Sequence, residues 1–92
     1  MSFTQSSAVT RAKQDLAKRL NLSVTEIAEK SVTEKDFPDM SLGAAVDGEM
    51  SAQMISTGWL IVLETHGHQY EYRADKYQLR LHNYHGRNCV ID

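Results

Sequence analysis

The sequence contains a single cysteine, Cys89, and has no apolar run that approaches the ~20 residues of a membrane-spanning helix. A single cysteine cannot form an internal disulfide. The first residues, MSFTQSSAVTRAK, lack the basic start and the apolar stretch of a secretion signal. From these absences we expect a cytoplasmic protein that has no membrane segment.

The chain also lacks an excess of charge of one sign, because its formal net charge is −2. Nucleic acids and anionic membranes attract basic surfaces, so we expect neither as a partner. A phosphate-binding glycine loop and a Ser-His-Asp spacing are missing as well. We therefore expect no cofactor and no enzymatic activity.

The stretch from Trp59 to His82 carries the clearest structural pattern. It is rich in β-branched and aromatic residues and is interrupted twice, which is typical of three antiparallel strands joined by tight turns. Gly67 occupies the second position of the first turn, where a type I′ conformation requires a positive φ. A two-residue turn pairs Leu63 with Tyr70, so apolar side chains share one face of this hairpin.

For the second turn, the apolar pattern predicts that Tyr72 pairs with Tyr77. Leu79 then lies beside Tyr70, while Arg80 points to the opposite, polar face. A slip of one residue would bury polar side chains. The expected core combines the apolar face of these strands with two leucines of an N-terminal helix: Ile61, Leu63, Tyr70, Tyr72, Leu79, Leu81, Leu16 and Leu20.

The N-terminal part predicts a helix that is capped by Ser6 or Ser7 and ends near Leu20. Apolar residues recur along it at helical spacing, so this stripe is expected to pack on the strands. The segment 27–37 alternates imperfectly and is rich in Glu and Lys, which favours a bulged edge strand over a helix. The predicted fold is α+β, with the order helix, strand, long loop and meander, and with three or four antiparallel strands.

The length of 92 residues predicts one small domain over residues 1–92. Residues 1–7 and 86–92 are expected to be flexible, although 89–91 could also form a last short strand. The region 38–58 opens at Pro38 and ends at Gly58, and it is long for a loop in so small a domain. It is therefore either functional or contains a short element, for which residues 50–55 are the best candidate.

Three motifs occur in order along the chain: FPDMSLG at 37–43, GWLIVLE at 58–64 and YEY at 70–72. Together they resemble a family of small uncharacterised bacterial domains with the pattern W-P-D-S-S-L-G-C-P, then P-G-Y-x-I-x-L-E, then Y-x-Y-H-T-D. The resemblance spans residues 16–81 and implies no known activity. The family pattern contains two cysteines, a disulfide in exported members, where this chain has Ala44 and, near the second position, His82.

The 38–58 loop is the candidate partner-binding region. Methionine repacks easily, so the loop could present an adaptable apolar surface. The alternative is that its apolar side chains only cover an open side of the core. Because long loops are disproportionately functional, we hypothesise a non-catalytic domain that binds an unknown protein or peptide through this loop and any exposed sheet edge. The candidate residues are Asp39, Met40, Leu42, Met50 and Met54.

The histidines support a second hypothesis, a metal-binding domain that uses His66, His68, His82 and His85. Neutral imidazole is a good ligand for zinc or copper. The predicted register, however, places His68 and His82 on opposite faces of the sheet. Exposed turn histidines without a shared ion are therefore the simpler interpretation.

The tyrosines at 70, 72 and 77 resemble the base-stacking platforms that some sheets present to nucleic acids. No basic surround accompanies them, and leucines share their face. Core packing beneath the helix is the favoured interpretation.

Overall fold

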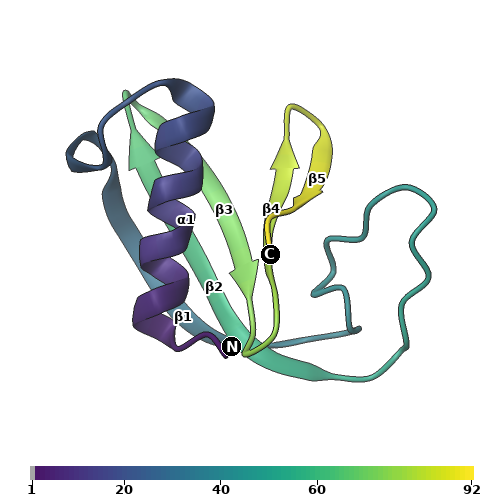
Figure 1. The fold of residues 1–92 in the computed structure, drawn as a ribbon. Coiled ribbons are helices and arrows are strands. Elements are labelled where there is room, and N and C mark those ends of the chain that lie inside the picture. Colours follow the sequence, from purple (N-terminus) through teal and green to yellow (C-terminus); the bar gives the residue numbers. More distant parts are fainter. Residues whose placement is uncertain (1) are drawn as a thin grey trace.

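The chain forms one helix and a five-stranded antiparallel sheet in the computed structural model, which describes residues 2–92 (Figure 1). The elements follow in the order α1 (Gln5–Leu20), a 3-10 turn η1 (Val24–Glu26), β1 (Ala28–Phe37), β2 (Ser56–Thr65), β3 (His68–Ala74), β4 (Leu79–Tyr84) and β5 (Arg87–Val90). Neighbours in the sheet are neighbours in the sequence. The predicted α+β meander is confirmed, with five strands instead of three or four.

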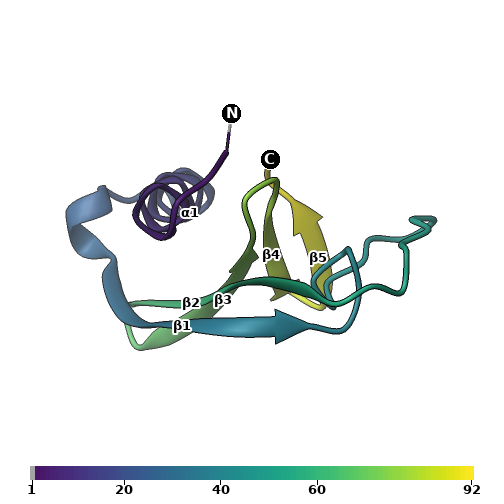
Figure 2. The same ribbon diagram turned by 90° about the horizontal axis from the view of Figure 1, so that it is seen from below.

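Helix α1 lies across one face of the sheet, and β4 and β5 rise on that same side, so that the curved sheet partly surrounds the helix (Figure 2). The core fills the space between them. Six of the eight residues predicted for the core are fully buried, while Tyr70 and Leu20 pack against its border. We call this face of the sheet the inner face and the opposite one the outer face.

The helix begins earlier than its serines suggest. Thr4 is the N-cap: its hydroxyl accepts a hydrogen bond from the Ser7 N–H at 3.1 Å, and the Ser7 hydroxyl accepts one from the Thr4 N–H at 2.8 Å. The prediction of Ser6 or Ser7 as the cap is therefore wrong, because Ser7 is instead the reciprocal partner in a capping box. Asn21, in the left-handed region with a φ of 56°, ends the helix.

The register of the first hairpin is confirmed, with Leu63 opposite Tyr70 and a two-residue turn in which His66 and Gly67 both have positive φ. The register predicted for the second hairpin is wrong. Tyr72 pairs with Leu81 and not with Tyr77. A slip of four residues preserves the side-chain alternation, so the leucines of β4 still face the core.

Asp75 explains why the second turn lies further along the chain than predicted. Its carboxylate accepts hydrogen bonds from the backbone N–H groups of Tyr77 at 2.7 Å and Gln78 at 3.0 Å. An aspartate that bonds the amides two and three residues ahead stabilises a turn at its own position. Strand β3 therefore continues to Ala74, and Tyr77 lies in the turn instead of in a strand.

Strand β1 is an edge strand whose register shifts between Glu29 and Ser31, as a bulged edge strand predicts. Within the two terminal stretches expected to be flexible, residues 5–7 belong to α1 and residues 87–90 form β5. Phe3 also donates a backbone hydrogen bond to the Lys76 carbonyl at 2.8 Å. Met1, which the same prediction included, lies outside the described residues.

Candidate functional site

The irregular segment between β1 and β2 spans residues 38–55, because β2 already begins at Ser56. The short element expected at residues 50–55 is absent, since these residues form neither helix nor strand. Gly58 lies within β2 and does not end the loop. A Cβ atom there would lie 1.9 Å from the Ala74 carbonyl oxygen, so the close approach of the two strands requires glycine.

The first half of this loop packs on the outer face of the sheet. Leu42 and Phe37 are buried, yet neither belongs to the core beneath α1. Arg73 of β3 contacts both residues. Its guanidinium lies 5.7 Å from the centroid of the Phe37 ring, and its Nη1 donates a hydrogen bond to the Leu42 carbonyl at 2.9 Å.

Arg80 of β4 forms the strongest attachment between the sheet and the loop. Its Nη1 and Nη2 donate to the two carboxylate oxygens of Glu49 at 2.5 and 2.6 Å, and Nη1 also donates to the Ala44 carbonyl at 3.1 Å. Only 6% of the Arg80 side chain is exposed. Paired guanidinium–carboxylate hydrogen bonds are strong and fix geometry. They also lower the pKa of Glu49 below its ordinary value.

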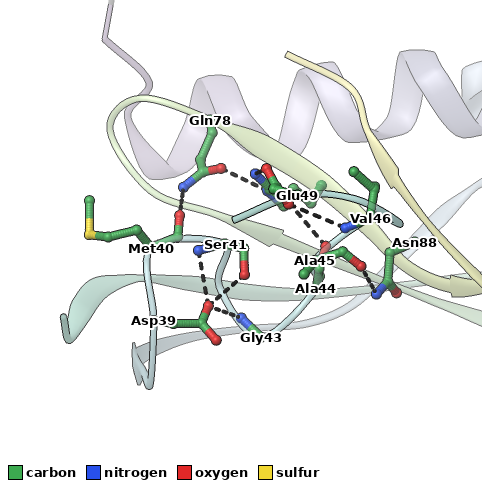
Figure 3. A network of polar contacts seen from close by, with 11 residues as sticks. Asp39, Met40, Ser41, Gly43, Ala44, Ala45, Val46, Glu49, Gln78 and Asn88 are labelled. Atoms are coloured by element: carbon green, nitrogen blue, oxygen red, sulfur yellow. Dashed lines mark hydrogen bonds and ion pairs between the residues drawn. The ribbon is translucent and has the colours of Figure 1, made fainter. Parts of the chain in front are cut away.

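Two amide side chains satisfy further carbonyls of the loop (Figure 3). Gln78 Nε2 donates to the Met40 carbonyl at 2.5 Å, and Asn88 Nδ2 donates to the Ala45 carbonyl at 2.8 Å. Gln78 Oε1 also accepts a hydrogen bond from Arg80 Nε at 2.7 Å. The loop, which forms no helix or strand, thus gains hydrogen-bond partners from β3, β4 and β5.

Asp39 shapes the loop from within. Its Oδ1 accepts hydrogen bonds from the Ser41 hydroxyl at 2.6 Å, the Ser41 N–H at 2.9 Å and the Gly43 N–H at 3.0 Å (Figure 3). The bond from the Ser41 hydroxyl, followed by that from Gly43, lowers the pKa of Asp39. These bonds hold a turn in which Leu42 has a φ of 59° and points into the buried layer.

Large apolar side chains are exposed near the two ends of the loop and in the turn between β3 and β4. The exposed fractions are 63% for Met54, 73% for Ile55, 77% for Tyr77 and 38% for Met40. These four residues line one groove of about 440 Å³. We call it the Met54–Tyr77 groove.

Comparison with known families matches residues 9–82 to a domain of unknown function, DUF8738. The chain belongs to this family. No curated protein and no solved structure gives a significant match. The resemblance to an uncharacterised family is therefore confirmed at the level of a domain of unknown function, and the individual motifs stay an interpretation.

The match to DUF8738 includes the whole 38–55 loop, together with Arg73, Gln78 and Arg80. Asn88 and β5 lie beyond it. No helix in residues 2–92 has the length and apolar character that a membrane crossing requires.

The structure separates the five residues that the sequence suggested for partner binding. Met40 and Met54 line the Met54–Tyr77 groove. Met50 is 97% exposed but is not among the residues that line the groove. Leu42 is fully buried, so its side chain is not presented to a partner in this conformation. Asp39 is partly buried, and its Oδ1 accepts hydrogen bonds within its own turn.

Sequence reasoning missed Ile55 and Tyr77 as residues of the groove. The sequence pattern suggests Ile55 only as the end of a short element, and it places Tyr77 in a strand and on a possible stacking platform. Asp75, two residues ahead of Tyr77, is the signal that could have placed this tyrosine in a turn.

The four histidines of the chain do not gather around one point. His66 Nε2 lies 3.8 Å from a Glu26 carboxylate oxygen, and His82 Nδ1 lies 3.0 Å from Glu71 Oε2. Residues 2–92 contain no group of three or more His, Cys, Asp or Glu side chains arranged to hold a metal ion. The structure thus provides no shared site for the metal-binding hypothesis.

Proposed function

We propose that this DUF8738 domain is a non-catalytic interaction module that binds an apolar segment of another protein in the Met54–Tyr77 groove. The observation that carries the proposal is the exposure of Met40, Met54, Ile55 and Tyr77 around one concavity. Apolar side chains gathered on a surface favour association, because contact removes their surface from water at roughly 25 cal/mol per Å².

The attachment of the loop base supports this proposal. Arg73, Arg80 and Gln78 donate hydrogen bonds to backbone carbonyls within residues 40–44, so binding need not order the whole loop. Less conformational entropy is then lost when a partner binds. Methionine side chains adapt to the shape of a partner, and an exposed tyrosine can anchor it.

The edge strand β1 is a poorer candidate than the groove. The edge strand β1 is bulged and exposes charged side chains: Glu29, Lys30, Glu34, Lys35 and Asp36. Charges and bulges on an edge oppose pairing with another strand. We therefore propose the groove, and not the β1 edge, as the place of the interaction.

A peptide-display selection tests the proposal and does not require an identified partner. Peptides would be selected on the full chain and counter-selected on Ile55→Asp, which places a charge in the groove. Ile55 is 73% exposed, so this variant should keep its folding free energy within about 0.5 kcal/mol. We expect selected peptides to carry apolar anchors and to lose binding to Ile55→Asp and Tyr77→Asp.

Val24→Asp is the matched control, because Val24 is an apolar residue of η1 that is 46% exposed and lies outside the groove. It should bind the selected peptides like the natural chain. Peptides that bind Ile55→Asp and Tyr77→Asp as tightly as the natural chain would refute the groove as the interaction site.

A further inference from the structure

A second concavity lies where β3 and β4 separate. The two strands pair only from Glu71–His82 to Ala74–Leu79, although β3 begins at His68 and β4 continues to Tyr84. Figure 1 shows β4 leaning away from β3 toward the β4–β5 turn. The space that opens has a volume of about 290 Å³ and is lined by His68, Gln69, Tyr70, Asn83, Tyr84 and His85.

Aromatic rings form most of this lining. The centroid of the Tyr84 ring lies 6.2 Å from that of Tyr70 and 4.3 Å from that of His85, whose ring meets it edge-on at 71°. Such separations are typical of interacting aromatic pairs. The three rings are therefore arranged as one cluster beside the opening.

The Tyr84 ring is supported from the core by a chain of polar contacts. The Arg19 guanidinium lies 5.4 Å from the Tyr84 centroid, and Arg19 Nε donates to Asp15 Oδ2 at 2.7 Å. The same Asp15 oxygen accepts a hydrogen bond from the hydroxyl of the fully buried Tyr72 at 2.7 Å. A ring held in this way needs little rearrangement when another ring stacks on it.

We propose that this concavity binds a small planar heteroaromatic molecule of the purine or pyrimidine class, stacked against Tyr84. Stacking on aromatic side chains suits any base, because every base has a π-face. Asn83 and His68 provide polar groups at the rim that can match the nitrogen and oxygen atoms of a heterocycle. The volume, at the lower limit of ligand pockets, suits one ring system and not an extended ligand.

The ligand is recognised through its ring and not through a phosphate. Arg19 contacts Tyr84 but is not among the residues that line the opening, so it supports the wall of the site. A nucleoside and its monophosphate should therefore bind alike. This site shares no residue with the Met54–Tyr77 groove, and its existence does not depend on the proposed interaction function.

The test is a 1H–15N NMR titration of the full chain with adenosine, uridine, adenosine monophosphate and ribose 5-phosphate. We expect shift changes centred on residues 68–70 and 83–85 with the nucleosides and the nucleotide, at similar affinities, and none with the sugar phosphate. Absence of changes at these residues with every base would overturn the proposal. Shifts produced equally by ribose 5-phosphate would also overturn it, because they would identify an anion site.

Variants of the ring cluster sharpen the test. Tyr84→Leu should weaken nucleoside binding by about 10-fold or more, while Tyr84→Phe keeps the ring and should bind within a few-fold of the natural chain. If Tyr84→Leu does not fold, His85→Ala decides the matter, since His85 is an exposed turn residue and its loss should also weaken binding. Unchanged affinity in His85→Ala and in a folded Tyr84→Leu would refute stacking at this site.

Discussion

The two faces of the sheet bury side chains in different ways. On the inner face, α1 covers residues such as Leu63 and Leu81, and this core is dominated by apolar side chains. On the outer face, Phe37 of β1 and Leu42 of the 38–55 loop are buried, and arginines of β3 and β4 donate hydrogen bonds to carbonyls of the loop. The inner face depends on apolar area, which has no preferred direction, whereas the outer face depends on hydrogen bonds of defined geometry.

This difference separates the stability of the sheet from the placement of the loop. Loss of inner packing affects the whole chain, because α1 and the strands share one core. Loss of an outer contact affects a segment that has no helix or strand of its own. Proteins open locally where few buried apolar contacts hold a segment, so the loop is expected to detach while the sheet stays folded.

The largest effect is expected from Leu63→Ala on the inner face. Leu63 is fully buried in the core, and its truncation should lower the free energy of unfolding by ~2–5 kcal/mol. Urea denaturation followed by Trp59 fluorescence measures the loss. Leu60→Ala, a half-buried residue of the same strand paired with Arg73 toward the outer face, is the control and should lose clearly less. A loss below ~1 kcal/mol for Leu63→Ala would contradict the distinction between the faces.

A smaller and more local effect is expected from Arg80→Ala. Removal of the guanidinium leaves the Ala44 carbonyl without its side-chain donor and the partly buried Glu49 carboxylate with only the Val46 N–H, which should cost ~1–3 kcal/mol. In hydrogen exchange, amides of residues 40–49 should lose protection while those of β2 and β3 keep theirs. In a double-mutant cycle, Glu49→Gln should add less to Arg80→Ala than it does to the natural chain.

Arg11→Ala is the matched control for this substitution. Arg11 also pairs with a carboxylate, that of Asp92 at 2.8 Å, but both side chains are more than a third exposed. Exposed pairs contribute little, so this variant should be within ~1 kcal/mol of the natural chain. If Arg80→Ala lowers the hydrogen-exchange protection of β2 and β3 as much as that of the loop, the stability of the sheet is not independent of the loop attachment.

The smallest effect, a loss of loop protection, is expected when the pH is lowered. In the folded chain, hydrogen bonds from Arg80 lower the pKa of Glu49, and the Ser41 hydroxyl lowers that of Asp39. A carboxyl whose pKa is lower folded than unfolded stabilises the folded state above its unfolded value of about 4, and this contribution disappears as the pH falls through the lowered pKa. Below pH ~4, amides of residues 39–49 should therefore lose protection, relative to their intrinsic exchange rates at the same pH, before the inner core is affected.

Glu49→Gln tests the cause of this acid effect. The variant has no carboxyl to titrate at that position, so the pH dependence of loop protection should be reduced to the part contributed by Asp39. Loop protection that is constant from pH 7 to pH 3 in the natural chain would refute the role of both carboxylates.

The sequence by itself determined the features that depend on local chemistry. The spacing of Leu16 and its neighbours predicted the helix, and Asn21 predicted its end. The two-residue turn at His66 and Gly67 determined the first hairpin register, because a short loop leaves the strands one way to pair. The alternation of apolar and polar residues correctly predicted that Leu79 and Leu81 of β4 face the core, although the predicted register was wrong by four residues.

Only the tertiary structure decided where the loop lies and which of its side chains stay exposed. Its attachment uses backbone carbonyls of Leu42, Ala44 and Ala45 as acceptors. Every residue has such a carbonyl, so the sequence does not show which carbonyls accept these hydrogen bonds. The sequence correctly predicted that Arg80 points away from the core. That it holds Glu49, 31 residues earlier in the chain, became visible only once the sheet had placed both side chains together.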